Sequence, residues 1–143
     1  MTEILWHGRG GQGAFTAARL LGAAFALKDD NSYALSFPSF GPERRGAPIR
    51  AFTKLDDKPI GDRSEITKAD YSIFLDDTLF SQNAFSELKP GGKILLNTKH
   101  SIKDPRVVTL PADCDAGRRR VGRGDFEASD YQYRYVRRLR RGF

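Results

Sequence analysis

The chain has 143 residues, of which 39% are hydrophobic, and a formal net charge of +6. This length suits one domain with a buried core, and the lone cysteine, Cys114, excludes an intrachain disulfide and a cysteine-ligated iron–sulfur cluster built by this chain alone. No apolar run approaches the length of a membrane span, and the amino terminus lacks a signal-type pattern, so we expect no membrane association and a cytoplasmic location.

The positive charge is concentrated near the carboxyl terminus. Residues 1–113 contain 15 Lys+Arg and 14 Asp+Glu, a net of +1, whereas residues 114–143 contain 9 Arg, no Lys and 4 acidic residues, a net of +5. A basic balance is typical of proteins that bind nucleic acid or anionic surfaces, but here it describes the tail alone. We therefore predict one domain at residues 1–113 and a separate basic tail at residues 114–143.

The amino-terminal third predicts three strands and a helix. Residues 3–7 form a short apolar run typical of a strand, and residues 14–28 carry apolar side chains at helical spacing. A turn at residues 29–32 precedes a strand at residues 33–37, and the alternation at residues 49–55 predicts another, half-buried strand. Since no helix separates these last two strands, we expect them to pair antiparallel in a mixed sheet.

The second half predicts three more strands and a helix. Strands are expected at residues 71–75, 93–97 and 106–110. A helix is expected from about residue 79 to 88, with capping chemistry before it and its end at residues 90–92. Strands that alternate with helices predict the α/β class, here a layered α/β/α domain with a mixed β-sheet.

A glycine-rich loop joins the first predicted strand to the first helix. Glycine allows positive φ and close approach of a ligand, and backbone amides at a helix amino terminus bind anions. We predict that this loop binds an anion or the backbone of a partner subunit, with the polar groups of Arg9 and Gln12 directed toward it. The alternative is a tight strand-to-helix turn with a structural role only. The predicted binding residues are Gly8, Arg9, Gly10, Gly11, Gln12 and Gly13.

A proline-rich segment, residues 36–48, supplies a second candidate. It places Arg44 and Arg45 in a loop whose prolines leave little conformational freedom to lose. Guanidinium groups bind phosphate or carboxylate through two parallel hydrogen bonds. We predict that both arginines contact a ligand or a partner subunit in a crevice shared with the glycine loop. An internally paired surface loop, with Glu43 as the partner, is the alternative.

Other polar residues have simpler interpretations. Asp76 and Asp77 lie at a strand-to-helix junction, where carboxylates cap a helix more often than they form an acid–base pair. His7 is interpreted as a hydrogen-bonded structural histidine. We therefore predict no catalytic residue and no metal ligand in this chain.

The tail lacks the pattern of a packed core. Its arginines alternate with tyrosines at residues 131–141, which would suit a nucleic-acid-binding arm or a solvated tail. Read one base later with ordinary codons, however, residues 130–142 can give Thr-Ile-Asn-Thr-Ala-Met-Leu-Gly-Ala-Phe-Ala-Gly-Ala, a helix-forming segment. We therefore predict that residues from about Cys114 onward are out of frame, and we expect no binding to nucleic acid.

The glycine loop and the proline-rich segment together resemble the gamma subunit of pyruvate:ferredoxin oxidoreductase. The resemblance covers residues 1 to about 113 and rests on residues 7–13, 37–48, 51–53 and 58–60 with Arg63. The glycine loop is shared with 2-oxoglutarate and indolepyruvate relatives, whereas residues 40–48 are closer to the pyruvate and branched-chain type. Family members normally continue further, so we expect an altered, shortened carboxyl terminus, poor solubility of the isolated chain and weak assembly.

The resemblance implies a subunit of pyruvate synthase without catalysis of its own. In such a complex a 2-oxoacid is decarboxylated to an acyl-CoA and ferredoxin is reduced. Thiamine diphosphate, Mg²⁺ and iron–sulfur clusters would belong to alpha, beta and ferredoxin-like delta subunits, with no cofactor bound by this chain alone. The domain is also implied to help hold coenzyme A.

Two other functions stay open. A gamma-type subunit of a branched-chain 2-oxoacid:ferredoxin oxidoreductase would share the same motifs. A stand-alone nucleotide-binding protein would also use a glycine loop. That class is disfavoured for NAD, because residues 36–38, at the end of the second strand, include no acid to bind a ribose hydroxyl.

Overall fold

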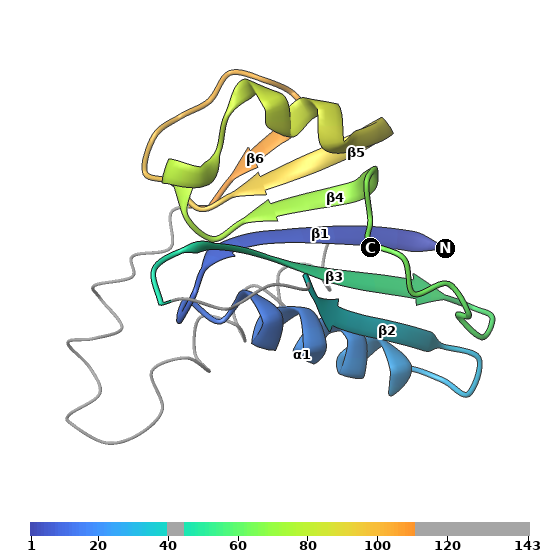
Figure 1. Cartoon of the computed structure of the whole chain (residues 1–143). Coiled ribbons are helices and arrows are strands. Elements are labelled where there is room, and N and C mark those ends of the chain that lie inside the picture. Colours follow the sequence, from blue (N-terminus) through green and yellow to red (C-terminus); the bar gives the residue numbers. More distant parts are fainter. Residues whose placement is uncertain (40–44, 111–143) are drawn as a thin grey trace.

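The computed structural model describes residues 1–39 and 45–110 of the chain (Figure 1). These residues form a six-stranded sheet in the order β2-β3-β1-β4-β5-β6, which confirms the predicted α/β class with a mixed sheet. The elements are β1 (Thr2–Arg9), α1 (Ala14–Ala26), β2 (Tyr33–Pro38), β3 (Pro48–Asp56), β4 (Ala69–Phe74), the 3₁₀ helices η1 (Asp77–Leu79) and η2 (Gln82–Glu87), β5 (Leu88–Leu96) and β6 (Val107–Thr109). No helix among these residues is long and apolar enough to cross a membrane.

Strand direction divides the sheet into two halves. β2 pairs antiparallel with β3, as predicted from the missing helix between them, and β3 also pairs antiparallel with β1. β1, β4, β5 and β6 run parallel to one another. Their carboxyl ends therefore lie along the same edge of the sheet, which is where α/β proteins place their binding loops.

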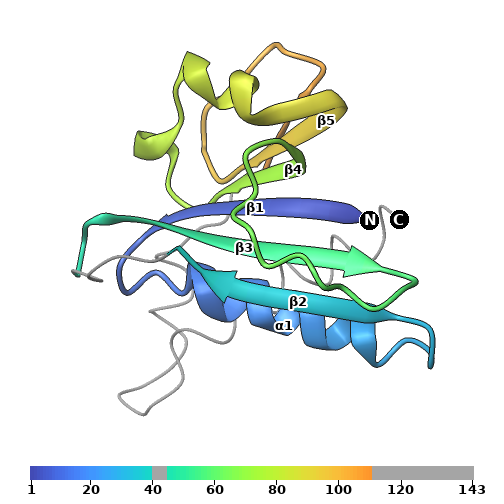
Figure 2. The same cartoon turned by 45° about the vertical axis from the view of Figure 1, so that its right-hand side comes forward.

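One face of the sheet is covered by α1, which lies along β1, β2 and β3 (Figures 1 and 2). Trp6 is fully buried in this interface, and its Nε1 donates to Thr53 Oγ1 at 3.1 Å. The Thr53 hydroxyl donates to the carbonyl oxygen of Ala18 at 3.1 Å, and Ser36 Oγ donates to the same oxygen at 2.9 Å. The polar groups under α1 are thus paired with one another, which removes the cost of burying them.

Gly22 sets how closely α1 approaches β2. A Cβ at this position would lie 2.6 Å from Ser36 Oγ, which is held by its bond to Ala18. We expect Gly22→Ala to lower the free energy of unfolding by about 1 kcal/mol, because the clash outweighs the gain in helix propensity. Urea unfolding measures the loss. In a Ser36→Ala background the same substitution should be neutral or stabilising. Gly61→Ala, which meets open space, is the matched control, and equal losses at both glycines would contradict the clash.

The opposite face carries η1 and η2 over β4, β5 and β6. Here the helix predicted at residues 79–88 is only partly correct, because the segment forms the short 3₁₀ helices η1 and η2 and the start of β5, not one continuous helix. The reason is local, since Ser86 Oγ bonds the Asn83 carbonyl at 2.7 Å and such side chains compete with helical hydrogen bonding. The predicted end at residues 90–92 is also wrong. These residues belong to β5, where Gly91 adopts φ 80° and the register with β4 shifts.

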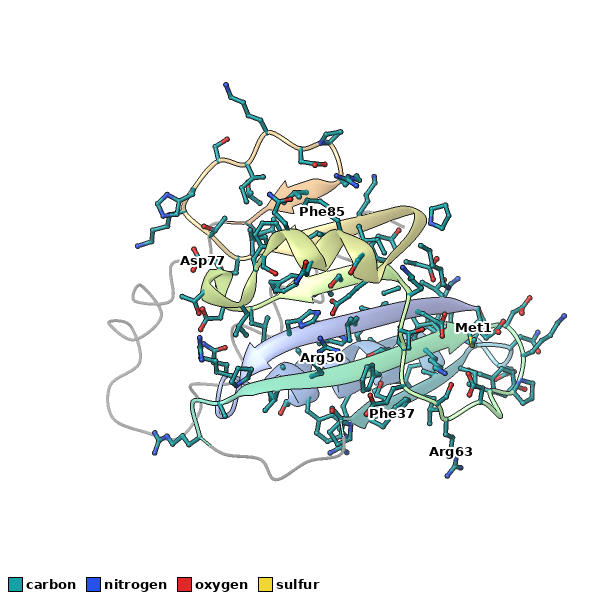
Figure 3. The ribbon with its side chains drawn as sticks, turned by 45° about the horizontal axis from the view of Figure 1, so that its top comes forward. Met1, Phe37, Arg50, Arg63, Asp77 and Phe85 are labelled. Carbon is teal, nitrogen blue, oxygen red and sulfur yellow. The ribbon has the colours of Figure 1, made fainter. Side chains whose placement is uncertain are left out.

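A buried lysine anchors the connection between β3 and β4. Lys54 is fully buried, and its Nζ lies 2.6 Å from Asp62 Oδ2 and 3.8 Å from Glu3 Oε1. A charge is tolerated in the interior only when it is paired in this way. The connection covers an apolar cluster on the sheet, against which Ile66 packs. Figure 3 shows it on the side of the sheet that carries Phe37.

Asp62→Asn is expected to remove a pH-dependent contribution to stability. The hydrogen bond from Lys54 lowers the pKa of the Asp62 carboxyl in the folded chain. Since the folded pKa is depressed, this contribution is complete above the unfolded pKa of about 4 and is lost as the pH falls through the folded value. Urea unfolding from about pH 6 to about pH 2 should therefore show a steeper loss for the wild type than for the variant. Identical slopes would contradict this account.

Candidate functional site

The two predicted segments meet at the carboxyl edge of the parallel strands. Gly10 and Arg45 form an isolated β-bridge. Gly10 N donates to the Ala47 carbonyl at 2.9 Å, and Gly46 N donates to the Gly10 carbonyl at 3.0 Å. The structure therefore brings the glycine loop (residues 8–13) and Arg45 side by side, as the sequence predicted. Arg44 lies outside the described residues.

The glycines of this loop meet separate backbone requirements. A Cβ on Gly8 would lie 3.0 Å from Ala14 Cβ, so Gly8 lets α1 start close against β1. Gly11 and Gly13 have φ of 90° and 83°, values that favour glycine. Gly13 is the N-cap of α1 and offers no side-chain acceptor to the first amides of the helix, which also lack intrahelical acceptors. Such amides attract an anion, and the binding role of these glycines stays a prediction.

Arg9 ties the glycine loop to two neighbouring segments. Its Nε donates to Asp76 Oδ2 at 3.1 Å and its Nη2 to Thr78 Oγ1 at 2.8 Å. Its Nη1 donates to the Gly46 carbonyl at 3.1 Å. The guanidinium thus joins the end of β1 to the residues after β4 and to the turn that precedes β3.

Gln12 makes a matching set of bonds within the loop. Its Oε1 accepts from Arg9 N at 2.7 Å, and its Nε2 donates to Asp76 Oδ2 at 2.9 Å. In this structure the side chains of Arg9 and Gln12 hold the loop in shape. Gly11, Gln12 and Arg45 are exposed, whereas Gly8 and Gly10 are buried, so only the tip of the loop and Arg45 are open to solvent.

Two carboxylates after β4 extend this network along the sheet edge. Asp76 caps η1 as predicted, with its Oδ1 accepting from Thr78 N at 3.0 Å. Burial raises the pKa of the Asp76 carboxyl, but hydrogen bonds from Thr78 and Gln12 and the charge of Arg9 outweigh burial and leave the pKa below its usual range. Asp77 Oδ2 accepts from Thr98 Oγ1, just after β5, at 2.7 Å. Figure 3 shows Asp77 at the end of the sheet opposite Met1.

His7 lies next to the loop but is packed into the sheet. Its ring stacks on Phe74 with centroids 4.2 Å apart, and its Nε2 lies 2.9 Å from Glu87 Oε2. Arg50 Nη2 bonds the other oxygen of Glu87 at 2.8 Å. Burial raises the pKa of Glu87, while His7 and Arg50 lower it and leave it below the usual range. These contacts agree with a structural role for His7.

Side chains that could ligate a metal do not cluster in the part of the chain that the structure describes. Within residues 1–39 and 45–110, no three His, Cys, Asp or Glu side chains converge to hold a metal ion. Cys114 lies outside the described residues.

The comparisons with known proteins agree on one protein family. The sequence model of the family described as pyruvate ferredoxin/flavodoxin oxidoreductase matches residues 3–128. Pyruvate synthase subunit PorC of Methanothermobacter marburgensis is 51% identical over 115 residues, which cover 78% of this chain and 64% of that protein. The pyruvate/ketoisovalerate oxidoreductases common subunit gamma of Thermococcus kodakarensis is 48% identical over 105 residues, which cover 73% of this chain and 56% of that protein.

A solved structure agrees with the sequence relatives. The crystal structure of pyruvate oxidoreductase subunit PORC from Thermotoga maritima matches with a TM-score of 0.59 and 34% identity, over 71% of this chain and 52% of that chain. The chain therefore spans less than two thirds of the length of each of these three proteins. The family match also runs past residue 113, where we predicted a domain boundary, and that boundary stays a prediction.

Proposed function

Since this chain belongs to the pyruvate ferredoxin/flavodoxin oxidoreductase family, we propose that it is the gamma subunit of a cytoplasmic pyruvate:ferredoxin oxidoreductase. The complex would convert pyruvate to acetyl-CoA by oxidative decarboxylation and pass the electrons to ferredoxin. Thiamine diphosphate with Mg²⁺ and iron–sulfur clusters would supply the decarboxylation and electron transfer on alpha, beta and ferredoxin-like delta subunits. The gamma chain contributes to assembly and offers a surface for coenzyme A.

The observation that carries this proposal is the contact between the glycine loop and Arg45. Coenzyme A presents phosphate groups, which suit backbone amides at a helix amino terminus and a guanidinium fork. The bridge between Gly10 and Arg45 pairs the backbones of the two segments, which supports a site built from both kinds of donor. Because bonds within the protein already order the loop, little conformational entropy remains to be lost on binding.

Co-expression of the full chain with alpha, beta and delta subunits tests the proposal. We expect the chain to co-purify with them and the complex to reduce ferredoxin in the presence of pyruvate and coenzyme A. Pantetheine, which lacks the phosphates, should replace coenzyme A poorly. A complex that assembles and turns over equally well without this chain would refute the assembly role, and equal KM values for the two thiols would refute the phosphate site.

A second substrate deserves the same assay. The Thermococcus kodakarensis relative is named as a subunit common to pyruvate and ketoisovalerate oxidoreductases. We therefore propose the branched-chain complex as the alternative assembly for this chain. Reconstitution with each set of catalytic subunits distinguishes the two, because a shared gamma chain supports both activities and a dedicated one supports a single activity.

A further inference from the structure

We propose that Asp76 is a positioning residue that couples the glycine loop to Arg45 and so shapes the anion site. The inference deepens the function proposed above and rests on it. The Asp76 carboxylate joins the glycine loop to the segment after β4, and it reaches the turn at Gly46 through the Arg9 side chain.

The carboxylate of Asp76 accepts hydrogen bonds on both oxygens. Oδ2 accepts from Arg9 Nε at 3.1 Å and from Gln12 Nε2 at 2.9 Å. Oδ1 accepts from Thr78 N at 3.0 Å and from Thr78 Oγ1 at 2.5 Å. Bonds to an ionised acceptor are stronger than those between neutral groups, so this carboxylate fixes both loop side chains at once.

The coupling continues from Arg9 to the Arg45 turn. With its Nε held by Asp76, Arg9 directs its Nη1 to the Gly46 carbonyl at 3.1 Å. Gly46 has φ 81°, and its own amide bonds the Gly10 carbonyl at 3.0 Å. Loss of the carboxylate would release the Arg9 side chain, and the turn that carries Arg45 would lose one of its bonds to the loop.

Asp76 also determines which arginine charge remains available to an anion at the loop. The Arg9 charge is compensated by Asp76, whereas the exposed Arg45 has no ion pair among the described residues. A bound phosphate would therefore be neutralised by Arg45 and by backbone amides. This division of roles explains why a carboxylate can sit beside an anion-binding loop without repelling the ligand.

Asp76→Asn in the assembled complex tests the proposal. Asparagine keeps the shape of the side chain but loses the charge and one acceptor. We expect the amides of Gly10 and Gly46 to exchange hydrogen about tenfold faster, and the KM for coenzyme A to rise about tenfold with kcat unchanged. Hydrogen-exchange mass spectrometry on peptides from the two loops gives the first readout, and steady-state kinetics gives the second.

Matched variants separate positioning from general stability. Asp104 lies outside the loop, and its carboxylate accepts from Arg106 Nε at 3.0 Å and from Arg106 Nη2 at 2.8 Å. Asp104→Asn removes this similar carboxylate and should change neither the exchange rates nor the KM for coenzyme A. Thr78→Val should reproduce part of the Asp76→Asn effect, whereas Thr78→Ser, which keeps the hydroxyl, should behave as wild type. If the Asp76→Asn chain fails to assemble into the complex, the comparison of Thr78→Val with Thr78→Ser still tests the positioning role.

The two readouts distinguish this inference from the proposed function. Unchanged exchange in both Asp76→Asn and Thr78→Val would overturn the positioning role. Faster exchange with an unchanged KM for coenzyme A would support the positioning role and refute the phosphate site at this loop. Faster exchange with a raised KM supports both.

Discussion

Trp6→Ala is expected to remove a large part of the free energy of unfolding of the chain at 25 °C. The side chain is fully buried under α1, and its removal leaves a cavity and takes away the Nε1 bond to Thr53 Oγ1 at 3.1 Å. Truncation of a buried aromatic residue costs about 3–5 kcal/mol, against a total stability of about 5–15 kcal/mol for a typical domain. Because Trp6 is the only tryptophan, unfolding in urea should be followed by circular dichroism.

Two variants control for this result. Trp6→Phe keeps an aromatic ring but removes the indole N–H, so its loss should fall between those of wild type and Trp6→Ala. Leu27→Ala removes an apolar side chain that is 86% exposed, and surface changes of this kind cost about 0.5 kcal/mol or less. Losses of similar size for Trp6→Ala and Leu27→Ala would mean that the α1 interface is not the main core.

The strands were predictable because local signals mark them. Apolar runs bounded by glycine, proline or turn residues correctly located all six strands of the described sheet. Most ends moved by one or two residues, whereas β5 starts at Leu88 and not at residue 93. The antiparallel pairing of β2 with β3 followed from chain connectivity, since no helix separates the two strands. Local propensity failed where side-chain bonding and sheet packing decided the outcome, as in η2 and at Gly91 in β5.

The sequence indicated the two loop segments of the candidate site but not the side-chain contacts that join distant segments. Glycine and proline mark the glycine loop and the Arg45 turn, and their unusual composition suggested that they act together. The pairing of Asp76 with Arg9 and of Lys54 with Glu3 was not visible, because Arg9 and Asp76 lie 67 positions apart and Lys54 meets Glu3 from another strand. Such pairs depend on strand order, and the topology with β1 between β3 and β4 emerges only from the folded sheet.

Arg45→Glu should cause the largest functional loss. Arg45 is exposed and its backbone pairs with Gly10 of the glycine loop, and its guanidinium is the cation that we propose for a phosphate of coenzyme A. A charge-assisted bond contributes about 1.5–3 kcal/mol, so charge reversal should raise the KM for coenzyme A about 100-fold. Arg45→Lys keeps the charge but loses the two-pronged hydrogen bonding of the guanidinium, so its KM for coenzyme A should lie between those of the wild type and Arg45→Glu. Steady-state kinetics of the assembled complex measures each value.

The comparison with a second exposed arginine decides whether this loss is specific. Arg63 lies on the connection between β3 and β4 (Figure 3), whereas Arg45 precedes the opposite end of β3. Arg63→Glu changes the net charge of the chain by the same amount as Arg45→Glu and should leave the KM for coenzyme A unchanged. Pantetheine adds a second test. Because it has no phosphates to bind Arg45, Arg45→Glu should leave the KM for pantetheine unchanged. An equal rise in KM for both arginine variants, or a loss with pantetheine as large as with coenzyme A, would place the phosphate site elsewhere in the complex.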